Sequence, residues 1–140
     1  MRFVVAADDD EAMITHVVTL LEERGHEVVR LPTGAWAKVA IEAASRVSRR
    51  EVDQAVLLCF TGTGVAMAAN KVRGVRAALC VDAPTAAGAR RWNDANVLAL
   101  ALRLLTPALA TEIVEAWLGT VYAGTDDDSL AAMAEARTVL

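Results

Sequence analysis

Short apolar runs rich in β-branched residues alternate along the chain with stretches in which apolar side chains recur every three or four positions. The runs predict five strands, at residues 3–7, 27–31, 56–59, 76–80 and 97–102. The stretches predict helices after residue 10, at 36–47, from 63 through 71, at 84–91, from 107 to about 119, and at 130–140. This alternation is typical of βαβ units and predicts an α/β protein built on a parallel sheet.

Local signals support several of these boundaries. Gly25 is placed to cap the end of the first helix, and Thr106 followed by Pro107 is a typical helix start, with Gly119 as its stop. The run at 56–59 is unbroken, which predicts a strand buried on both faces. We expect one domain over residues 1–124 and a helical tail over 125–140. That tail has few large apolar residues, so we expect it to pack on the domain or on a second subunit.

Composition and charge exclude several classes of protein. The 140 residues are 55% hydrophobic and 23% charged, too apolar for disorder and too interrupted by charge for a membrane span. A net charge of −4 offers no basic excess for binding nucleic acid. The N-terminal run lacks the basic flank and length of a signal peptide, so we expect a cytoplasmic protein in which Cys59 and Cys80 do not pair.

Ligands of open parallel sheets bind beyond the carboxyl ends of the strands, and this rule selects the candidate site. The segments expected there are 8–10, 59–64, 80–82 and Arg103. The loop T-G-T-G at 61–64 follows a strand and opens a helix, so its N–H groups can point at an anion. It is neither the dinucleotide fingerprint nor a Walker loop, and an ordinary tight turn explains it as well.

Cys59 precedes this loop, where a helix N-terminus favours the thiolate form and so suits a base or nucleophile. The alternative is that Cys59 only fills space in the core. Asp8 to Asp10 can bind sugar hydroxyls, join Asp82 at a divalent metal, or cap the next helix, and capping is the default for at least one of them. His16 and His26 fit surface or packing positions.

The three tryptophans divide into two kinds. Trp36 and Trp92 are expected near helix starts on the side of the candidate site, where an aromatic face can stack on a sugar or form a wall of the pocket. Trp117 belongs to an apolar helix face and is expected in the core.

Four blocks of sequence resemble the ribose-5-phosphate isomerase B and galactose-6-phosphate isomerase family. They are C-F-T-G-T-G at 59–64, A-A-N-K-V at 68–72, R-A-A-L-C at 76–80 and N-D-A-N-V-L-A at 93–99, with Gly74 between the second and third. The resemblance runs from residue 1 to about 124. It implies a Rossmann-like, three-layer αβα fold and a homodimer with active sites at the subunit interface.

The resemblance also implies an activity, the interconversion of an aldose and a ketose through a cis-enediolate, with no cofactor and no metal. Cys59 then matches the base that moves a proton between adjacent carbons, and Thr61 the loop threonine. Asp8 matches an aspartate that holds sugar hydroxyls, Asn93 a substrate-contacting asparagine, and Arg103 an arginine that helps to hold phosphate. The expected substrate-binding set is Asp8, Asp9, Trp36, Phe60, Gly62, Thr63, Gly64, Trp92, Asn93 and Arg103.

Departures from the family pattern concentrate on phosphate and ring opening. Asp9 stands where the family has a histidine near the phosphate, and residues 124–128 read G-T-D-D-D where the family has phosphate-binding arginines. Trp92 replaces the histidine that assists ring opening and cannot exchange protons. Trp36 replaces a tyrosine, and Phe60 replaces the first loop glycine.

These departures favour an isomerase whose substrate is not ribose 5-phosphate but an unphosphorylated or differently substituted sugar, such as one already in open-chain form. A second hypothesis is a catalytically silent member that binds a sugar-like ligand or a partner protein. A third, weaker hypothesis is a metal-dependent enzyme that uses the aspartates.

Overall fold

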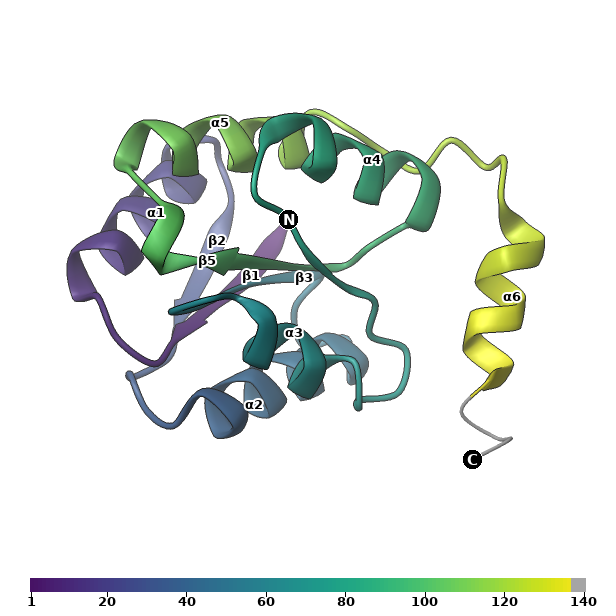
Figure 1. The fold of residues 1–140 in the computed structure, drawn as a ribbon, viewed down its shortest axis with the longest axis horizontal. Helices are drawn as coiled ribbons and strands as arrows, with labels where there is room; N and C mark the ends of the chain where they lie inside the picture. Colours follow the sequence, from purple (N-terminus) through teal and green to yellow (C-terminus); the bar gives the residue numbers. More distant parts are fainter. Residues whose placement is uncertain (137–140) are drawn as a thin grey trace.

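The computed structural model describes residues 1–136 and contains the predicted alternation of strands and helices (Figure 1). Its strands are β1 Arg2–Ala7, β2 Glu27–Arg30, β3 Gln54–Cys59, β4 Ala77–Leu79 and β5 Val97–Ala101. Its helices are α1 Glu11–Glu23, α2 Trp36–Ser48, α3 Thr63–Ala69, α4 Ala83–Asn93, α5 Pro107–Leu118 and α6 Asp127–Ala136, with a 3₁₀ turn at Leu102–Leu104.

All five strands in this part of the chain pair in parallel, in the order β2-β1-β3-β5-β4. Helices α1, α4 and α5 cover one face of the sheet, and α2 and α3 cover the other (Figure 1). Alternate residues of β1 supply the two cores: Phe3 and Val5 face the first layer, Val4 and Ala6 the second. The predicted three-layer α/β fold with a five-stranded parallel sheet is therefore confirmed.

The predicted local signals position the elements. Every residue of β3 is buried, as expected for a central strand covered on both faces. Thr106 caps α5 by accepting a hydrogen bond from the Leu109 N–H at 3.1 Å, and Pro107 is its first residue. Trp117 is 1% exposed and lies in the core.

Two elements between β3 and β5 are shorter than predicted. Helix α3 ends at Ala69 rather than Lys71, because the Asn70 side chain bonds both the N–H and the carbonyl of Ala77 and so closes a turn. Strand β4 begins at Ala77 rather than Arg76, whose N–H bonds the Asn96 side chain at 2.8 Å instead of a neighbouring strand.

Helix α6 stands apart from the rest of the chain, and none of its residues is buried (Figure 1). It begins at Asp127, three residues before the predicted start, with Asp127 and Asp128 in its positive first turn. The predicted continuation over 137–140 lies outside the described residues. Packing of the 125–140 tail on the domain or on a second subunit stays a prediction. Within residues 1–136, no helix has the length and apolar character needed to cross a bilayer.

Candidate functional site

The carboxyl ends of three neighbouring strands bring together most of the predicted site residues. Strand β3 lies between β1 and β5, with Leu58 paired to Ala7 and Cys59 paired to Ala101. Asp8, the first residue after β1, therefore lies beside the end of β3, and its N–H donates to the Leu58 carbonyl at 3.4 Å. On the other side, the Arg103 N–H donates to the Phe60 carbonyl at 3.0 Å and ties the 3₁₀ turn to the loop after β3.

The loop between Cys59 and α3 needs its first glycine for two reasons. Gly62 has φ +74°, in the left-handed region, and a Cβ there would collide with Leu79 and lie 3.0 Å from the Leu100 carbonyl carbon. The chain consequently turns tightly against β5 before α3 begins at Thr63. The Thr61 and Thr63 hydroxyls are hydrogen-bonded at 2.7 Å and lie on the exposed side. The loop therefore combines N–H groups with two hydroxyls that can exchange protons.

The two cysteines have different environments, and both are free thiols. Cys59 ends β3 and is 5% exposed at the base of the loop. Cys80 lies after β4, is 1% exposed, and its thiol points to the Ala78 carbonyl. Burial, with a smaller contribution from Asp82, raises the pKa of Cys80 to about 12, so Cys80 stays a neutral thiol at physiological pH.

The three aspartates after β1 have separate surroundings. Asp10 caps α1, as expected for at least one of them: its carboxylate accepts the Met13 N–H at 3.0 Å. Asp9 is exposed, and its Oδ1 accepts the Asp10 N–H at 2.7 Å. The Oδ1 of Asp8 is shielded from solvent and has no hydrogen-bond partner among residues 1–136. A buried acceptor without a donor is costly, so this oxygen is an acceptor available to a donor from outside the described residues.

Aromatic side chains flank the loop on its open side. Trp36 is the first residue of α2, as predicted, and its ring lies on Gly64, where a Cβ would be 2.9 Å from Cε3. Phe60 is 66% exposed beside the Arg103 backbone. The guanidinium of Arg103 is exposed and makes no ion pair within the described residues. This edge thus offers a thiol, carboxylates, one unpaired cation and two aromatic surfaces.

Trp92 and Asn93 do not join this group. Trp92 lies at the end of a helix, so the prediction that it lies near a helix start was wrong. They are the last two residues of α4, just before β5 begins at Val97. Val97 pairs with Ala55 and Ala101 with Cys59, which puts about 13 Å of strand between the two sets of residues. Trp92 folds back on its own helix, where a Cβ on Gly88 would lie 2.8 Å from its ring. A single chain therefore holds the predicted site in two halves.

Neither histidine lies at the carboxyl ends of the strands. His16 Nε2 is 2.9 Å from the Thr111 hydroxyl between α1 and α5, and His26 lies 3.0 Å from the N-terminal nitrogen. Within residues 1–136, no three His, Cys, Asp or Glu side chains group as metal ligands would. A cavity of about 900 Å³ lies at the other edge, between the 70–77 loop and α6.

Sequence reasoning missed the residues that fix the second half. Arg76, Arg90 and Asp94 form ion pairs where α4 meets β5. Arg90 and Asp94 have the i,i+4 spacing of an ion pair on a helix, which is a usable signal. Arg76 lies 18 residues from Asp94, and no spacing in the sequence indicates that it joins them.

Comparisons with known proteins identify the family to which the chain belongs. Residues 3–133 match the family model described as Ribose/Galactose Isomerase. The chain is 41% identical over 115 residues to ribose-5-phosphate isomerase B of Escherichia coli, covering 77% of this chain and 76% of the relative. It is 35% identical over 131 residues to D-erythrulose-4-phosphate isomerase of Pectobacterium atrosepticum, covering 89% and 86%.

Solved structures show the same architecture. Ribose-5-phosphate isomerase B of Clostridium thermocellum superposes with a TM-score of 0.95 at 29% identity, over 99% of each chain. The five-stranded parallel sheet with its two helix layers is thus the architecture of known ribose-5-phosphate isomerase B structures. The chain belongs to the ribose/galactose isomerase family of sugar-phosphate isomerases.

Proposed function

We propose that this protein is an aldose–ketose isomerase that transfers a proton through a cis-enediolate, on a substrate other than ribose 5-phosphate. The observation that carries the proposal is the position of Cys59 at the end of β3, beside the Thr61–Thr63 hydroxyl pair and the N–H groups of the loop. A base, proton-exchanging hydroxyls and donors for an oxyanion are the parts that such a reaction requires.

In the proposed reaction the Cys59 thiolate removes a proton from the carbon next to the carbonyl. The electrons of the broken C–H bond form the C=C bond of the enediolate, and the carbonyl oxygen takes the negative charge. N–H groups of residues 62–64 stabilise that charge, and Thr61 exchanges protons with the two oxygens. The Cys59 thiol then returns its proton to the adjacent carbon, so Cys59 ends the cycle as it began.

Substrate binding is proposed to use both halves of the site, one from each of two copies. The solvent-shielded Asp8 Oδ1 would accept a hydrogen bond from a sugar hydroxyl, and Arg103, whose backbone N–H bonds the Phe60 carbonyl, would supply a cation beside the loop. Trp92 and Asn93 would come from the second copy, since they lie too far from Cys59 in their own chain. A homodimer with shared sites follows, and sedimentation analysis should find dimers.

The proposed change of substrate rests on charge and on Trp92. Asp9 and the acidic residues 126–128 would repel a phosphate where the family resemblance implies cations, which favours an unphosphorylated or differently substituted sugar. The indole N–H of Trp92 can donate a hydrogen bond but neither gains nor loses a proton near neutral pH, so it cannot catalyse ring opening, which favours an open-chain substrate. The Pectobacterium relative is named for a four-carbon ketose 4-phosphate, which cannot form a furanose ring because it has no C5 hydroxyl to add to its C2 carbonyl. Tetruloses, free and 4-phosphorylated, and tetrose 4-phosphates cannot close a furanose ring, so they are the first compounds to test.

A panel of free and phosphorylated tetroses, pentoses and hexoses tests the proposal, first by ligand-induced thermal shift and then by isomerisation. We expect one open-chain or unphosphorylated sugar to be converted faster than ribose 5-phosphate. Cys59→Ala should lower kcat by about 10³-fold or more, whereas the matched variant Cys80→Ala should keep it. If ribose 5-phosphate were converted fastest, the proposed change of substrate would be wrong, but the proposed isomerase activity would stand.

The alternative is a silent family member that binds a sugar-like ligand or a partner protein, favoured by the loss of a ring-opening group at Trp92. Alkylation separates the two. Rapid modification of Cys59 with loss of turnover supports the isomerase, while an unreactive thiol with no conversion across the panel supports the silent member.

A further inference from the structure

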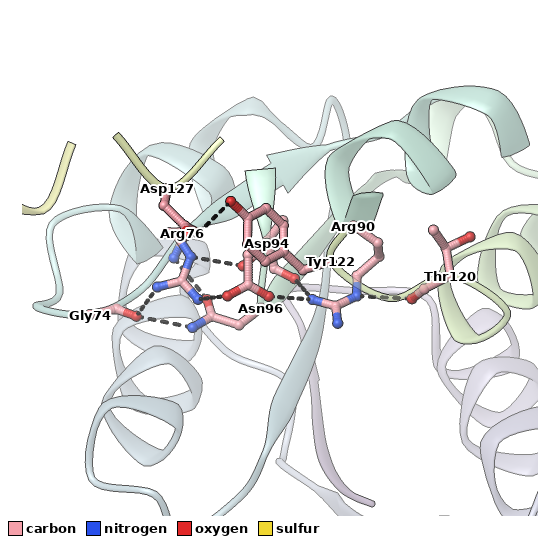
Figure 2. Close-up of polar contacts among 9 residues, drawn as sticks. Gly74, Arg76, Arg90, Asp94, Asn96, Thr120, Tyr122 and Asp127 are labelled. Atoms are coloured by element: carbon pink, nitrogen blue, oxygen red, sulfur yellow. Dashed lines mark hydrogen bonds and ion pairs between the residues drawn. The ribbon is translucent and has the colours of Figure 1, made fainter. Parts of the chain in front are cut away.

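A cluster of charges fixes the point where α4 ends and β5 begins. Asp94 follows α4 in the left-handed region, with φ +46°. Its carboxylate lies between two guanidinium groups, Arg76 Nη2 at 3.2 Å from Oδ2 and Arg90 Nη1 at 3.4 Å from Oδ1. Figure 2 shows these groups on opposite sides of the carboxylate. The side chain of Asp94 therefore bridges the start of β4 and the body of α4.

The backbone of the same segment is held by the same side chains. Arg76 Nε donates to the Asp94 carbonyl at 2.7 Å, and Arg90 Nη1 donates to the Ala95 carbonyl. The Asn96 side chain accepts the Arg76 N–H at 2.8 Å and donates to the Gly74 carbonyl at 3.0 Å (Figure 2). Side-chain hydrogen bonds thus hold all three residues: the backbone carbonyls of Asp94 and Ala95 accept from arginines, and Asn96 is held through its own side chain.

Arg90 connects this segment to the core. It is only 9% exposed, its guanidinium stacks 5.5 Å from the Trp117 ring centroid, and its Nε donates to the Thr120 carbonyl. Trp117 in turn donates from Nε1 to the buried Gln54 side chain at 2.7 Å. A turn at the molecular surface is therefore anchored through one buried cation to the centre of the fold.

The residues just before this anchor are exposed. The Asn93 side chain makes no hydrogen bond within residues 1–136, and Trp92 is 55% exposed. Side-chain contacts hold the backbone at residues 94–96, whereas the Asn93 amide just before them has no partner among residues 1–136. This is the arrangement expected of a group that must meet a ligand outside its own chain.

We propose that Asp94, held by Arg76 and Arg90, is a positioning residue that presents Asn93 to the catalytic site of a second copy of this chain. This inference rests on the shared site of the proposed function. Asp94→Asn is the informative variant, because asparagine keeps the size and tolerates the left-handed backbone while the charge that grips both arginines is lost. We expect kcat to fall by about 10- to 100-fold with the dimer intact. Glu51→Gln, which removes a carboxylate paired with Arg49 at the same edge of the sheet, should leave kcat unchanged.

Mixed dimers distinguish positioning in the partner's site from a structural role. Cys59→Ala and Asp94→Asn chains, carrying different tags, are co-expressed at equal levels. Each mixed dimer then holds one site with an intact Cys59 and an intact partner Asp94, so about a quarter of the wild-type activity should return. Activity no higher than the sum of the two homodimers would overturn the proposal, because a structural defect stays with its own chain.

Cross-linking supplies a readout that needs no substrate. In a Cys80→Ala background, Asn93→Cys should be joined to Cys59 of the other copy by a short bis-maleimide, giving a covalent dimer. Adding Asp94→Asn should slow this reaction about tenfold. An unchanged rate overturns the positioning role, and the absence of any covalent dimer overturns the shared site with it. Asp94-dependent cross-linking in a protein that converts no sugar would support positioning while rejecting the proposed activity.

Discussion

The indole ring of Trp36 lies directly on Gly64, so that a Cβ at Gly64 would be 2.9 Å from Cε3 of the ring. This contact joins the first residue of α2 to the second residue of α3 and sets one wall of the candidate site. The glycine is needed for space, because its φ is not in the left-handed region. The wall and the glycine turn are therefore a single packing unit.

Gly64→Ala should consequently have opposite effects in two backgrounds. In the native chain the methyl group displaces the Trp36 ring and should cost about 1–3 kcal/mol of unfolding free energy. With Trp36→Ala the clash is gone, and the better helix former should stabilise by up to about 1 kcal/mol. Urea unfolding of the four proteins measures the coupling. Equal effects in both backgrounds would contradict the packing unit.

The bond between Trp117 and Gln54 makes a prediction about stability. Both side chains are buried, so Gln54→Leu leaves the Trp117 N–H without an acceptor and should cost about 1–3 kcal/mol. Trp117→Phe carries its own packing cost, but adding Gln54→Leu to it should cost much less than in the native chain. Additive losses in the urea-unfolding cycle would show that the hydrogen bond contributes little.

Predictions from the sequence were correct for elements whose structure depends on residues close together in the chain. The apolar run of β3, the Thr106-Pro107 start of α5 and the buried face with Trp117 depend on local chemistry and periodicity, and each is confirmed. The motif around Cys59 was equally local. Its glycine turn was recognisable from the sequence alone. The reason that Gly62 is necessary, its close packing against Leu79 and Leu100, is visible only in the structure.

The second half of the site could not be predicted in the same way. The end of α4 is set by Asp94 in a left-handed conformation, with no glycine to mark the stop, and by Arg76 from an earlier segment. Trp92 was therefore assigned to the wrong end of a helix. The partnerless Oδ1 of Asp8 is likewise a consequence of packing, invisible in a run of three aspartates.

His26 predicts a pH-dependent stability. Burial first, and then the charge of the N-terminal ammonium 3.0 Å away, lower the pKa of His26 below its ordinary value. The folded state then binds fewer protons than the unfolded state, so the stability contribution is present above pH about 6.5 and is lost as pH falls through the lowered pKa. The melting temperature of the native protein should fall more between pH about 7 and 5 than that of His26→Gln. N-terminal acetylation removes the charge but not the burial, so it should reduce the difference in melting temperature between the native protein and His26→Gln only in part. Identical pH profiles for these two proteins would contradict the assignment to His26.

Asp9 tests the electrostatic argument about phosphate. Its Oδ1 accepts the Asp10 N–H, a bond that the amide oxygen of Asp9→Asn can keep, so the variant changes charge with little change of shape. Removing one negative charge near the loop should tighten binding of a phosphorylated sugar about 2- to 5-fold, and the gain should shrink as salt is added. Binding of free sugars should not change. Glu22→Gln makes the same change in net charge at the far end of α1, about 20 Å away and beyond the screening length, and is the matched control. Equal gains for phosphorylated and free sugars, or an equal gain from Glu22→Gln, would show that Asp9 does not select against phosphate.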